Sequence, residues 1–200
     1  MMQAEGLSPK KVWICGHSIV HWAHARATES IWEENLGFPS CIQISWITQR
    51  GMRWHHVLPL LTNQISLLGP PDFIVFQVGE NELGEWRGID LTRVIVKHLE
   101  TLHAQYPQII LCWSYLLERQ FWFGQGGCIL QRSVMNRARN NLNRRIKRKV
   151  QFLGGMAIQH PNITLKNEAI FRRDGVHLTD MGNDIWLSDL VECLRFWLQI

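Results

Sequence analysis

The sequence lacks any long apolar run, and this absence excludes a helix that crosses a membrane. No stretch of its 200 residues approaches the roughly 18 consecutive apolar residues that such a helix needs. The first residues, MMQAEGLSPKK, also lack the apolar core of a signal peptide. Internal repeats and low-complexity segments are missing as well. We therefore expect one globular domain over residues 11–200, preceded by an N-terminal tail of residues 1–10.

The sequence also lacks cysteines at paired spacing. Its five cysteines are an odd number, and no two of them form a C-x-x-C pair. Cys15 and Cys112 fall within apolar segments that predict core strands, where a free cysteine behaves as a small hydrophobic side chain. This pattern favours a reducing environment, and we expect a cytoplasmic protein.

Acidic residues are absent from one long segment. Between Glu118 and Glu168 the chain has ten Lys or Arg and no Asp or Glu, although the net charge of the whole chain is only +4. Within this segment, residues 132–149 form a predicted basic helix with an apolar stripe of Val134, Ala138, Leu142, Ile146 and Val150. A solvated outer face explains most such helices. The alternative is binding of RNA or DNA phosphates by Arg144, Arg145, Lys147, Arg148 and Lys149.

Apolar segments of strand length alternate along the chain with segments of helical periodicity. Strands are predicted over residues 12–15, 41–47, 73–78, 108–113 and 162–165. Helices are predicted over residues 19–26, 54–68, 90–106, 133–153 and 182–200. This alternation predicts an α/β protein with a five-stranded parallel sheet and helices on both faces. Ligands of such sheets bind where the carboxyl ends of the strands meet.

The first predicted strand ends at Gly16-His17-Ser18, where a helix is expected to begin. A serine in this turn exposes its hydroxyl at the carboxyl edge of the sheet. Its backbone N–H lies near a helix N-terminus, where partial positive charge stabilises an oxyanion. Ser18 is therefore a candidate nucleophile. For a serine taken alone, capping of the helix is the commoner role.

Asp174-Gly175-Val176-His177 lies between the last strand and the last helix, so it reaches the same edge of the sheet. A carboxylate three residues before a histidine can hold one ring nitrogen while the other accepts a proton from a serine hydroxyl. An isolated D-x-x-H is more often an ordinary turn. Together with Ser18, however, His177 and Asp174 form a candidate catalytic triad.

Two further residues follow other predicted strands. Gly51 follows the second strand and can present a backbone N–H, and Asn81 follows the third and can present a side-chain amide. Both residue types are common in turns. Their positions at the same edge as Ser18 make them candidate oxyanion donors.

These four blocks resemble the SGNH, or GDSL-like, hydrolase family, which is named for a serine, a glycine, an asparagine and a histidine. The matching residues are Gly16-His17-Ser18, Gly51, Gly79-Glu80-Asn81-Glu82 and Asp174-Gly175-Val176-His177. The resemblance implies a three-layer α/β/α flavodoxin-like sandwich and a serine esterase that hydrolyses a small acyl ester through an acyl-enzyme. It assigns Ser18 as nucleophile, His177 as base, Asp174 as its orienting group, and Ser18, Gly51 and Asn81 as oxyanion donors.

The segments VWICGHSIVHWA and FRRDGVHLTDMGNDIW are especially similar to SGNH-type domains of vertebrate transposable elements. Two residues depart from the family pattern, because His17 and Glu82 stand where the family usually has Asp. Both changes concern the packing beneath the turn, and whether they weaken activity stays open at this point. An α/β-hydrolase is disfavoured, since Val20 occupies the second glycine position of G-x-S-x-G.

The histidines raise the question of a metal, because His17, His21 and His24 share one face of the predicted helix. No cysteine or carboxylate completes a convincing ligand set, and a serine triad needs no metal. We therefore expect neither a metal nor another cofactor. The sequence predicts a serine esterase for a small-molecule ester. The rival hypothesis is a module of the same fold that binds nucleic acid through the basic helix.

Overall fold

Five parallel strands form the centre of the molecule in the order β2-β1-β3-β4-β5. They are β1 (Lys10–Gly16), β2 (Ile42–Thr48), β3 (Phe73–Gln77), β4 (Ile110–Ser114) and β5 (Met156–Ile158). The structure is a computed structural model and describes residues 9–200. The predicted tail falls largely outside these residues, and Lys10 already belongs to β1. The strand order is that of flavodoxin-like folds, so the predicted fold class is confirmed.

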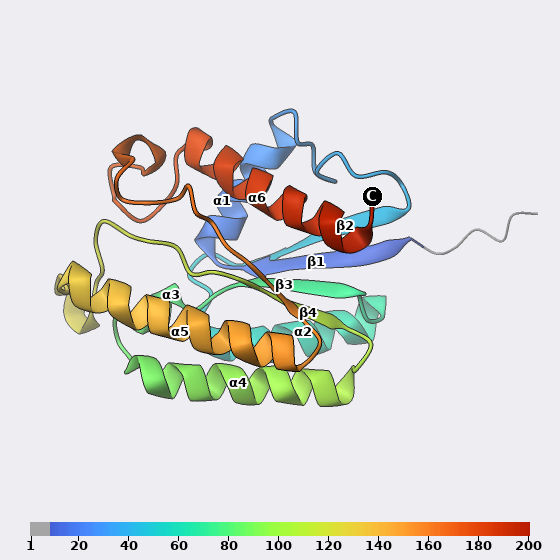
Figure 1. Ribbon diagram of the computed structural model, residues 1–200, viewed down its shortest axis with the longest axis horizontal. Helices are drawn as coiled ribbons and strands as arrows, with labels where there is room; N and C mark the ends of the chain where they lie inside the picture. The colour runs from blue at the N-terminus through green and yellow to red at the C-terminus, as the bar shows by residue number, and fades with distance from the viewer. Residues whose placement is uncertain (1–8) are drawn as a thin grey trace, which may run out of the picture.

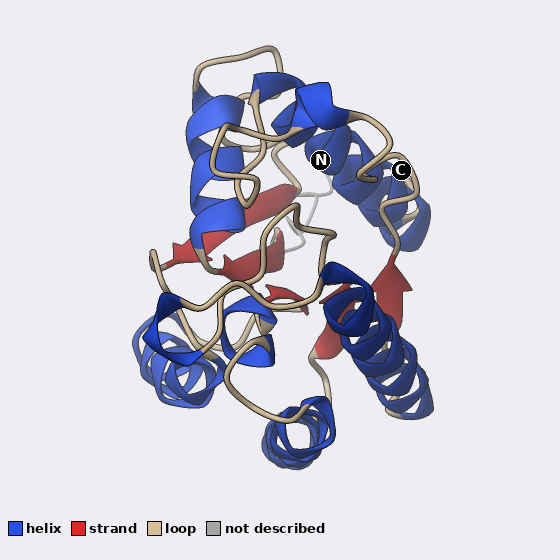
Figure 2. Ribbon diagram, turned by 90° about the vertical axis from the view of Figure 1, so that its left-hand side faces the viewer, coloured by secondary structure: helices blue, strands red, loops and turns tan. Residues whose placement is uncertain are grey.

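Helices cover both faces of the sheet (Figure 1). On one face lie α1 (Ser18–Thr28) and α6 (Asp180–Leu198), and on the other lie α2 (Trp54–Leu68), α4 (Gly88–Gln105) and α5 (Arg132–Phe152). Figure 2 shows the strands between these two layers. A short helix, α3 (Glu80–Leu83), follows β3, and 3₁₀ turns span Gln125–Gly127 and Glu168–Ile170. Within residues 9–200, no helix has the length and hydropathy needed to cross a membrane.

The interior strand β1 shows why a buried parallel strand has a continuous apolar sequence. Val12 and Ile14 pack in the core on the side of α1 and α6. Trp13 and Cys15 pack in the core on the side of α2, α4 and α5. Since successive side chains of a strand point to opposite faces, both sets must be apolar when both faces are covered.

The fifth strand was predicted at the wrong place. Residues 162–165 form no strand, and β5 is instead Met156–Ile158, directly after the two glycines that follow α5. A Cβ atom on Gly155 would lie 2.1 Å from the carbonyl oxygen of Leu111. Only glycine lets the chain pass this close to β4, so the strand begins earlier than the apolar residues Ile163 and Leu165 suggest.

The predicted apolar stripe of α5 is also partly wrong. Val134 is exposed, whereas Arg139, a member of the basic segment, is buried. Arg139 donates a hydrogen bond to the carbonyl oxygen of Leu116 at 2.8 Å and pairs with Glu118 at 3.1 Å. A buried guanidinium with such partners holds the loop after β4 against the helix, and it is not available at the surface.

Candidate active site

The chain turns from β1 into α1 at Gly16, where the space allows no side chain. A Cβ atom there would lie 2.2 Å from Cγ2 of Val20 and 2.8 Å from the carbonyl oxygen of Gln77. The N-cap of α1 is His17, whose Nδ1 accepts a hydrogen bond from the N–H of Ile19 at 3.2 Å. Since His17 fills this position, Ser18 does not cap the helix. Ser18 is instead the first residue of α1, whose N–H has no partner within the helix.

His177 and Asp174 lie next to Ser18 at the carboxyl edge of the sheet. Nε2 of His177 is 2.9 Å from Oγ of Ser18, and Nδ1 of His177 is 2.7 Å from Oδ2 of Asp174. The other carboxylate oxygen of Asp174 accepts the N–H groups of Val176 and His177 at 2.8 and 2.9 Å. The turn therefore fixes the carboxylate and the ring together, and the structure brings all three predicted triad residues into contact.

The environment of Asp174 favours its ionised form. Partial burial raises the pKa of Asp174, but the hydrogen bonds from the His177 ring and from the two backbone N–H groups outweigh it, and the net pKa is lowered. The ionised carboxylate of Asp174 accepts a hydrogen bond from the Nδ1–H group of His177. The lone pair of Nε2 is then directed toward the hydroxyl of Ser18, which is the arrangement that a general base requires.

Gly51 and Asn81 line the same pocket as Ser18 and His177, a cavity of about 670 Å³. Gly51 has a φ of +70°, in the left-handed region that favours glycine. Nδ2 of Asn81 donates to the carbonyl oxygen of Met52 at 3.0 Å, and Oδ1 of Asn81 accepts from Arg119 at 3.3 Å. These two contacts fix the amide and leave its second N–H free to donate to a ligand. The two residues are thus placed as predicted, and their role as oxyanion donors stays a prediction.

The rest of the pocket wall comes from residues to which the sequence assigned no catalytic role. The loop after β4 contributes Arg119, Trp122, Phe123 and Gly124. The remaining lining residues are Arg50, Arg53, Glu80, Glu85 and Val176. This loop joins β4 to α5 over more than a dozen residues, and connections of that length are usually functional. Nothing in its sequence showed which side chain would point to the serine.

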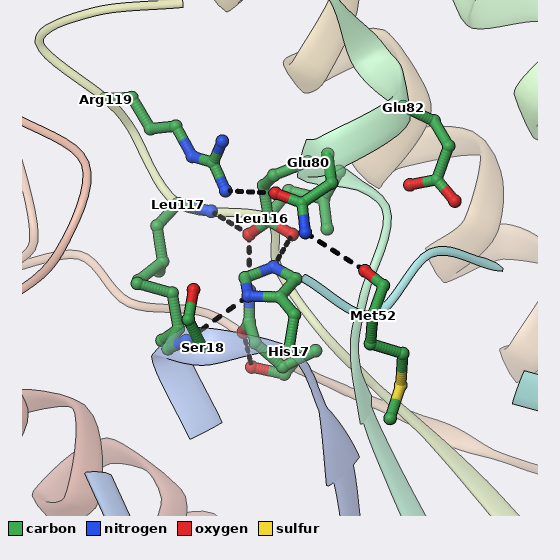
Figure 3. A network of polar contacts seen from close by, with 12 residues as sticks. His17, Ser18, Met52, Glu80, Glu82, Leu116, Leu117 and Arg119 are labelled. Carbon is green, nitrogen blue, oxygen red and sulfur yellow. Dashed lines mark hydrogen bonds and ion pairs between the residues drawn. The ribbon is translucent and has the colours of Figure 1, made fainter. Parts of the chain in front are cut away.

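His17, one of the two departures from the family pattern, has a partner. Its Nε2 lies 2.6 Å from Oε2 of Glu80, and both side chains are fully buried beneath Ser18 (Figure 3). The other carboxylate oxygen of Glu80 accepts from Nε2 of Gln77 at 2.7 Å and from the N–H of Leu117 at 3.2 Å. Burial raises the pKa of Glu80, but His17, Arg119 and backbone hydrogen bonding outweigh it and hold the pKa at about 2. His17 thereby caps α1 and ties it to α3.

Glu82, the other departure, is turned away from Ser18 in Figure 3. Its carboxylate accepts a hydrogen bond from the N–H of Trp54, the first residue of α2. Burial raises the pKa of Glu82, and this effect outweighs the hydrogen bonds that lower it. Glu82 therefore anchors the start of α2, and neither departure removes an atom from the Ser18, His177 and Asp174 arrangement.

The histidines of α1 do not converge on one point. His17 is bonded to Glu80, His21 packs edge-on against Trp22, and His24 stacks on Trp46. Across residues 9–200, no three or more His, Cys, Asp or Glu side chains are grouped as metal ligands would be.

The predicted phosphate-binding cluster lies at the opposite edge of the sheet. Because α5 follows β4 and runs back to the start of β5, its C-terminal half lies far from the carboxyl ends of the strands (Figure 1). Arg144, Arg145 and Arg148 are exposed, but Lys149 pairs with Glu100 of α4 at 2.7 Å. The segment thus has an acidic partner from another helix. Between α4 and α5, a groove of about 550 Å³ is lined by Ile89, Thr92, Arg93, Val96, Arg145, Arg148, Lys149 and Phe152.

Comparison with known proteins finds no matching family model and no matching curated protein. Solved structures do match. One is a protein from Bacteroides fragilis assigned as an acylhydrolase, with a TM-score of 0.72 and 20% identity over 98% of this chain and 93% of that one. Another is a GDSL-like lipase from Bacteroides thetaiotaomicron, with a TM-score of 0.70 and 17% identity over 93% of this chain and 88% of that one. The fold is that of the SGNH hydrolases.

A third similar structure is the psychrotrophic esterase EstA from Pseudoalteromonas sp., inhibited by monoethylphosphonate. Its TM-score is 0.67 and its identity 9%, over 96% of this chain and all of that one (100%). At such identities the likeness establishes the SGNH fold alone. The chemistry of this chain must therefore be argued from its own residues.

Proposed function

We propose that this protein is a serine esterase that hydrolyses a small acyl ester. The observation that carries the proposal is the contact of Ser18 Oγ with His177 Nε2 at 2.9 Å, with Asp174 at 2.7 Å from the other ring nitrogen. This contact opens into a pocket of about 670 Å³. The SGNH fold supports the proposal because structures named as esterases and lipases share it.

The proposed reaction begins when His177 Nε2 takes the hydroxyl proton of Ser18 as Oγ attacks the ester carbonyl carbon. The carbonyl oxygen becomes an oxyanion, which the N–H groups of Ser18 and Gly51 and the Asn81 amide stabilise. The C–O bond to the alcohol then breaks, and His177 returns the proton to the leaving oxygen. In the second half, water attacks the acylated Ser18 through the same steps and releases the acid.

The proposal is tested by the hydrolysis of 4-nitrophenyl acetate. The wild-type protein should release nitrophenolate catalytically, whereas His177→Gln, which retains a polar side chain but lacks a base, should be inactive. His24→Gln is the matched control, because His24 lies on α1 and stacks on Trp46. Equal activity of wild type and His177→Gln would disprove the proposed base.

We propose nucleic-acid binding as a second, separable function. It is favoured by the groove between α4 and α5, where Arg145 and Arg148 carry exposed charges beside the exposed ring of Phe152. Cations with an adjacent aromatic ring suit the backbone and bases of a single strand. The resemblance to transposable-element domains, which stays a prediction, is consistent with such a role.

Binding of an oligonucleotide at increasing salt tests this second function. A plot of log K against log salt should slope by about −0.7 per phosphate contact for a single strand and about −0.9 for a duplex. Neutralising Arg144, Arg145, Lys147, Arg148 and Lys149 should flatten the slope without changing esterase activity. If binding is unchanged when these charges are removed, or if no binding occurs at low salt, the nucleic-acid proposal is wrong and the basic face of α5 is only solvated.

A further inference from the structure

Two arginines of the molecule are buried to the same extent but differ in their partners. Arg119 and Arg139 are each 8% exposed. Arg139 has a carboxylate, Glu118, at 3.1 Å and a carbonyl oxygen at 2.8 Å. Arg119 has a single hydrogen bond, to the neutral Oδ1 of Asn81 at 3.3 Å, and forms no ion pair within residues 9–200. A guanidinium carries five N–H donors, so most of those on Arg119 lack a partner.

The unsatisfied side of Arg119 faces the pocket that contains Ser18. Its guanidinium lies over the ring of Trp122, 5.3 Å from the ring centroid, which supports one face of the planar group. Figure 3 shows the side chain extending from the loop after β4, and its Nη2 donates the hydrogen bond to Asn81. Ring and amide together fix the orientation of Arg119 before any ligand binds, which lowers the entropy cost of binding.

Among residues 9–200 no carboxylate of the pocket forms an ion pair with Arg119, although Arg119 lowers the pKa of Glu80 from a longer distance. Glu85 is paired with Arg53, which donates a hydrogen bond to each of its carboxylate oxygens. Glu80 accepts hydrogen bonds from His17, Gln77 and the N–H of Leu117.

The carboxylate of Asp174 is paired with Nδ1 of His177. Arg50, which also lines the pocket, forms no ion pair in the described part of the chain and lies over Trp22. Within the described residues, the pocket therefore has two arginines that form no ion pair, Arg50 and Arg119.

We propose that Arg119 binds an anionic group, a carboxylate or a phosphate, on the ester substrate. This inference rests on the proposed esterase and narrows its substrate class to esters that carry a negative charge near the scissile carbonyl. Arg119 donates a hydrogen bond to the candidate oxyanion donor Asn81. The guanidinium charge is therefore separated from the reacting carbonyl oxygen by one side chain. A planar guanidinium recognises a carboxylate or phosphate through two parallel N–H···O bonds.

The anion can belong to either half of the ester, and two pairs of substrates distinguish the halves. The first pair, the 4-nitrophenyl hemiester of succinic acid and its methyl ester, places the charge on the acyl group. The second pair, 4-acetoxybenzoate and its methyl ester, places it on the alcohol. In one of the two pairs, kcat/KM should be about 10- to 100-fold higher for the charged member, as one charge-assisted contact provides.

Arg119→Met should remove this preference and Arg119→Lys should restore part of it. Arg195→Met, which removes an exposed positive charge on α6, is the matched control and should keep the wild-type ratio. If Arg119 only positioned Asn81, its loss would lower kcat/KM equally for charged and neutral members. An unchanged ratio in Arg119→Met, or no preference in wild type, would overturn the proposal.

A binding measurement separates this proposal from the esterase itself. Inorganic phosphate, titrated into wild-type protein by calorimetry, should bind, and its affinity should fall at least tenfold in Arg119→Met. A protein that hydrolyses neutral esters but neither prefers charged ones nor binds phosphate through Arg119 contradicts the anion site alone. A protein that binds phosphate through Arg119 but hydrolyses no ester contradicts the esterase and retains the anion site. Melting temperatures of both variants establish that they are folded.

Discussion

Two Ser-His-Asp arrangements with nearly the same distances occur in this molecule. In the first, Ser18, His177 and Asp174 are joined by contacts of 2.9 and 2.7 Å. In the second, Ser114 Oγ lies 2.8 Å from His160 Nε2, and His160 Nδ1 lies 2.9 Å from Asp189 of α6. Ser18 lines a large pocket, whereas Ser114 has no exposed surface. Distances alone therefore do not make an active site.

The two serines also differ in where their single hydroxyl proton goes. Nε2 of Gln77 donates to Glu80, so the Oε1 atom of Gln77 is the group that faces Ser114. Ser114 donates its proton to this oxygen, and His160 must then donate to Ser114. A ring nitrogen that carries a proton cannot act as a base. The hydroxyl of Ser18 has no competing acceptor among residues 9–200, so its proton is available to His177.

The largest effect should come from removing each serine in turn. Ser18→Ala should lower kcat for 4-nitrophenyl acetate on the order of 10⁶-fold, as loss of a nucleophile does in serine hydrolases. Ser114→Ala should leave kcat within about threefold of wild type in steady-state assays. If Ser114→Ala abolishes turnover in a folded protein while Ser18→Ala does not, the assignment of the two sites is reversed.

The next effect concerns the proposed oxyanion donors in the pocket around Ser18. Asn81→Ala should lower kcat about 10²- to 10³-fold, because one charge-stabilising donor contributes about 2.7–4 kcal/mol in the transition state. Initial rates over a range of ester concentrations provide the measurement. A change in KM with an unaltered kcat would make Asn81 a substrate-binding residue instead.

The effects of the two substitutions on stability should be reversed, with the larger loss at Ser114 and the smaller at Ser18. Ser114→Ala removes the hydrogen bonds that the buried Gln77 oxygen and Nε2 of His160 make with the hydroxyl, which costs about 1–3 kcal/mol. Ser18 lies at the first position of α1 beside the pocket, so Ser18→Ala should change the free energy of unfolding by no more than about 0.5 kcal/mol. Urea unfolding of both variants measures this contrast. Equal losses would mean that the buried arrangement contributes no special stability.

The smallest effect concerns Glu80, which links the two arrangements through His17 and Gln77. Its pKa in the folded protein, about 2, lies below the ordinary value of 4.5. The stability from ionised Glu80 is therefore fully present above pH 4.5 and is lost as the pH falls toward 2. The stability gap between wild type and Glu80→Gln should shrink over this window.

Glu82 provides a matched control, because burial raises its pKa and the pH dependence of its contribution to stability should have the opposite sign. Its ionisation disfavours the folded state, so the stability of wild type relative to Glu82→Gln should fall as the pH rises above 4.5. Urea unfolding at several pH values follows both gaps. The same pH trend for the two variants would contradict the assigned charge states.

The sequence predicted the parts of the site that depend on strand ends. Ser18 follows the end of β1, and His177 lies just before α6. The parallel sheet itself therefore brings the two residues to one edge. Arg119 was not predicted, because its position depends on the path of the loop after β4 and on the contacts of its side chain with Trp122 and Asn81. The contact between His17 and Glu80 joins residues 63 positions apart, and no local sequence pattern predicts it.

The central claim is that Ser18 is an activated nucleophile and Ser114 is not. Treatment with a fluorophosphonate ester, followed by peptide mass spectrometry, tests this claim directly, because the reagent phosphonylates only a serine whose proton is removed by a base. The account predicts one adduct per chain, on the peptide that contains Ser18, and none in Ser18→Ala. An adduct on Ser114, or a folded wild-type protein that stays unlabelled, would contradict it.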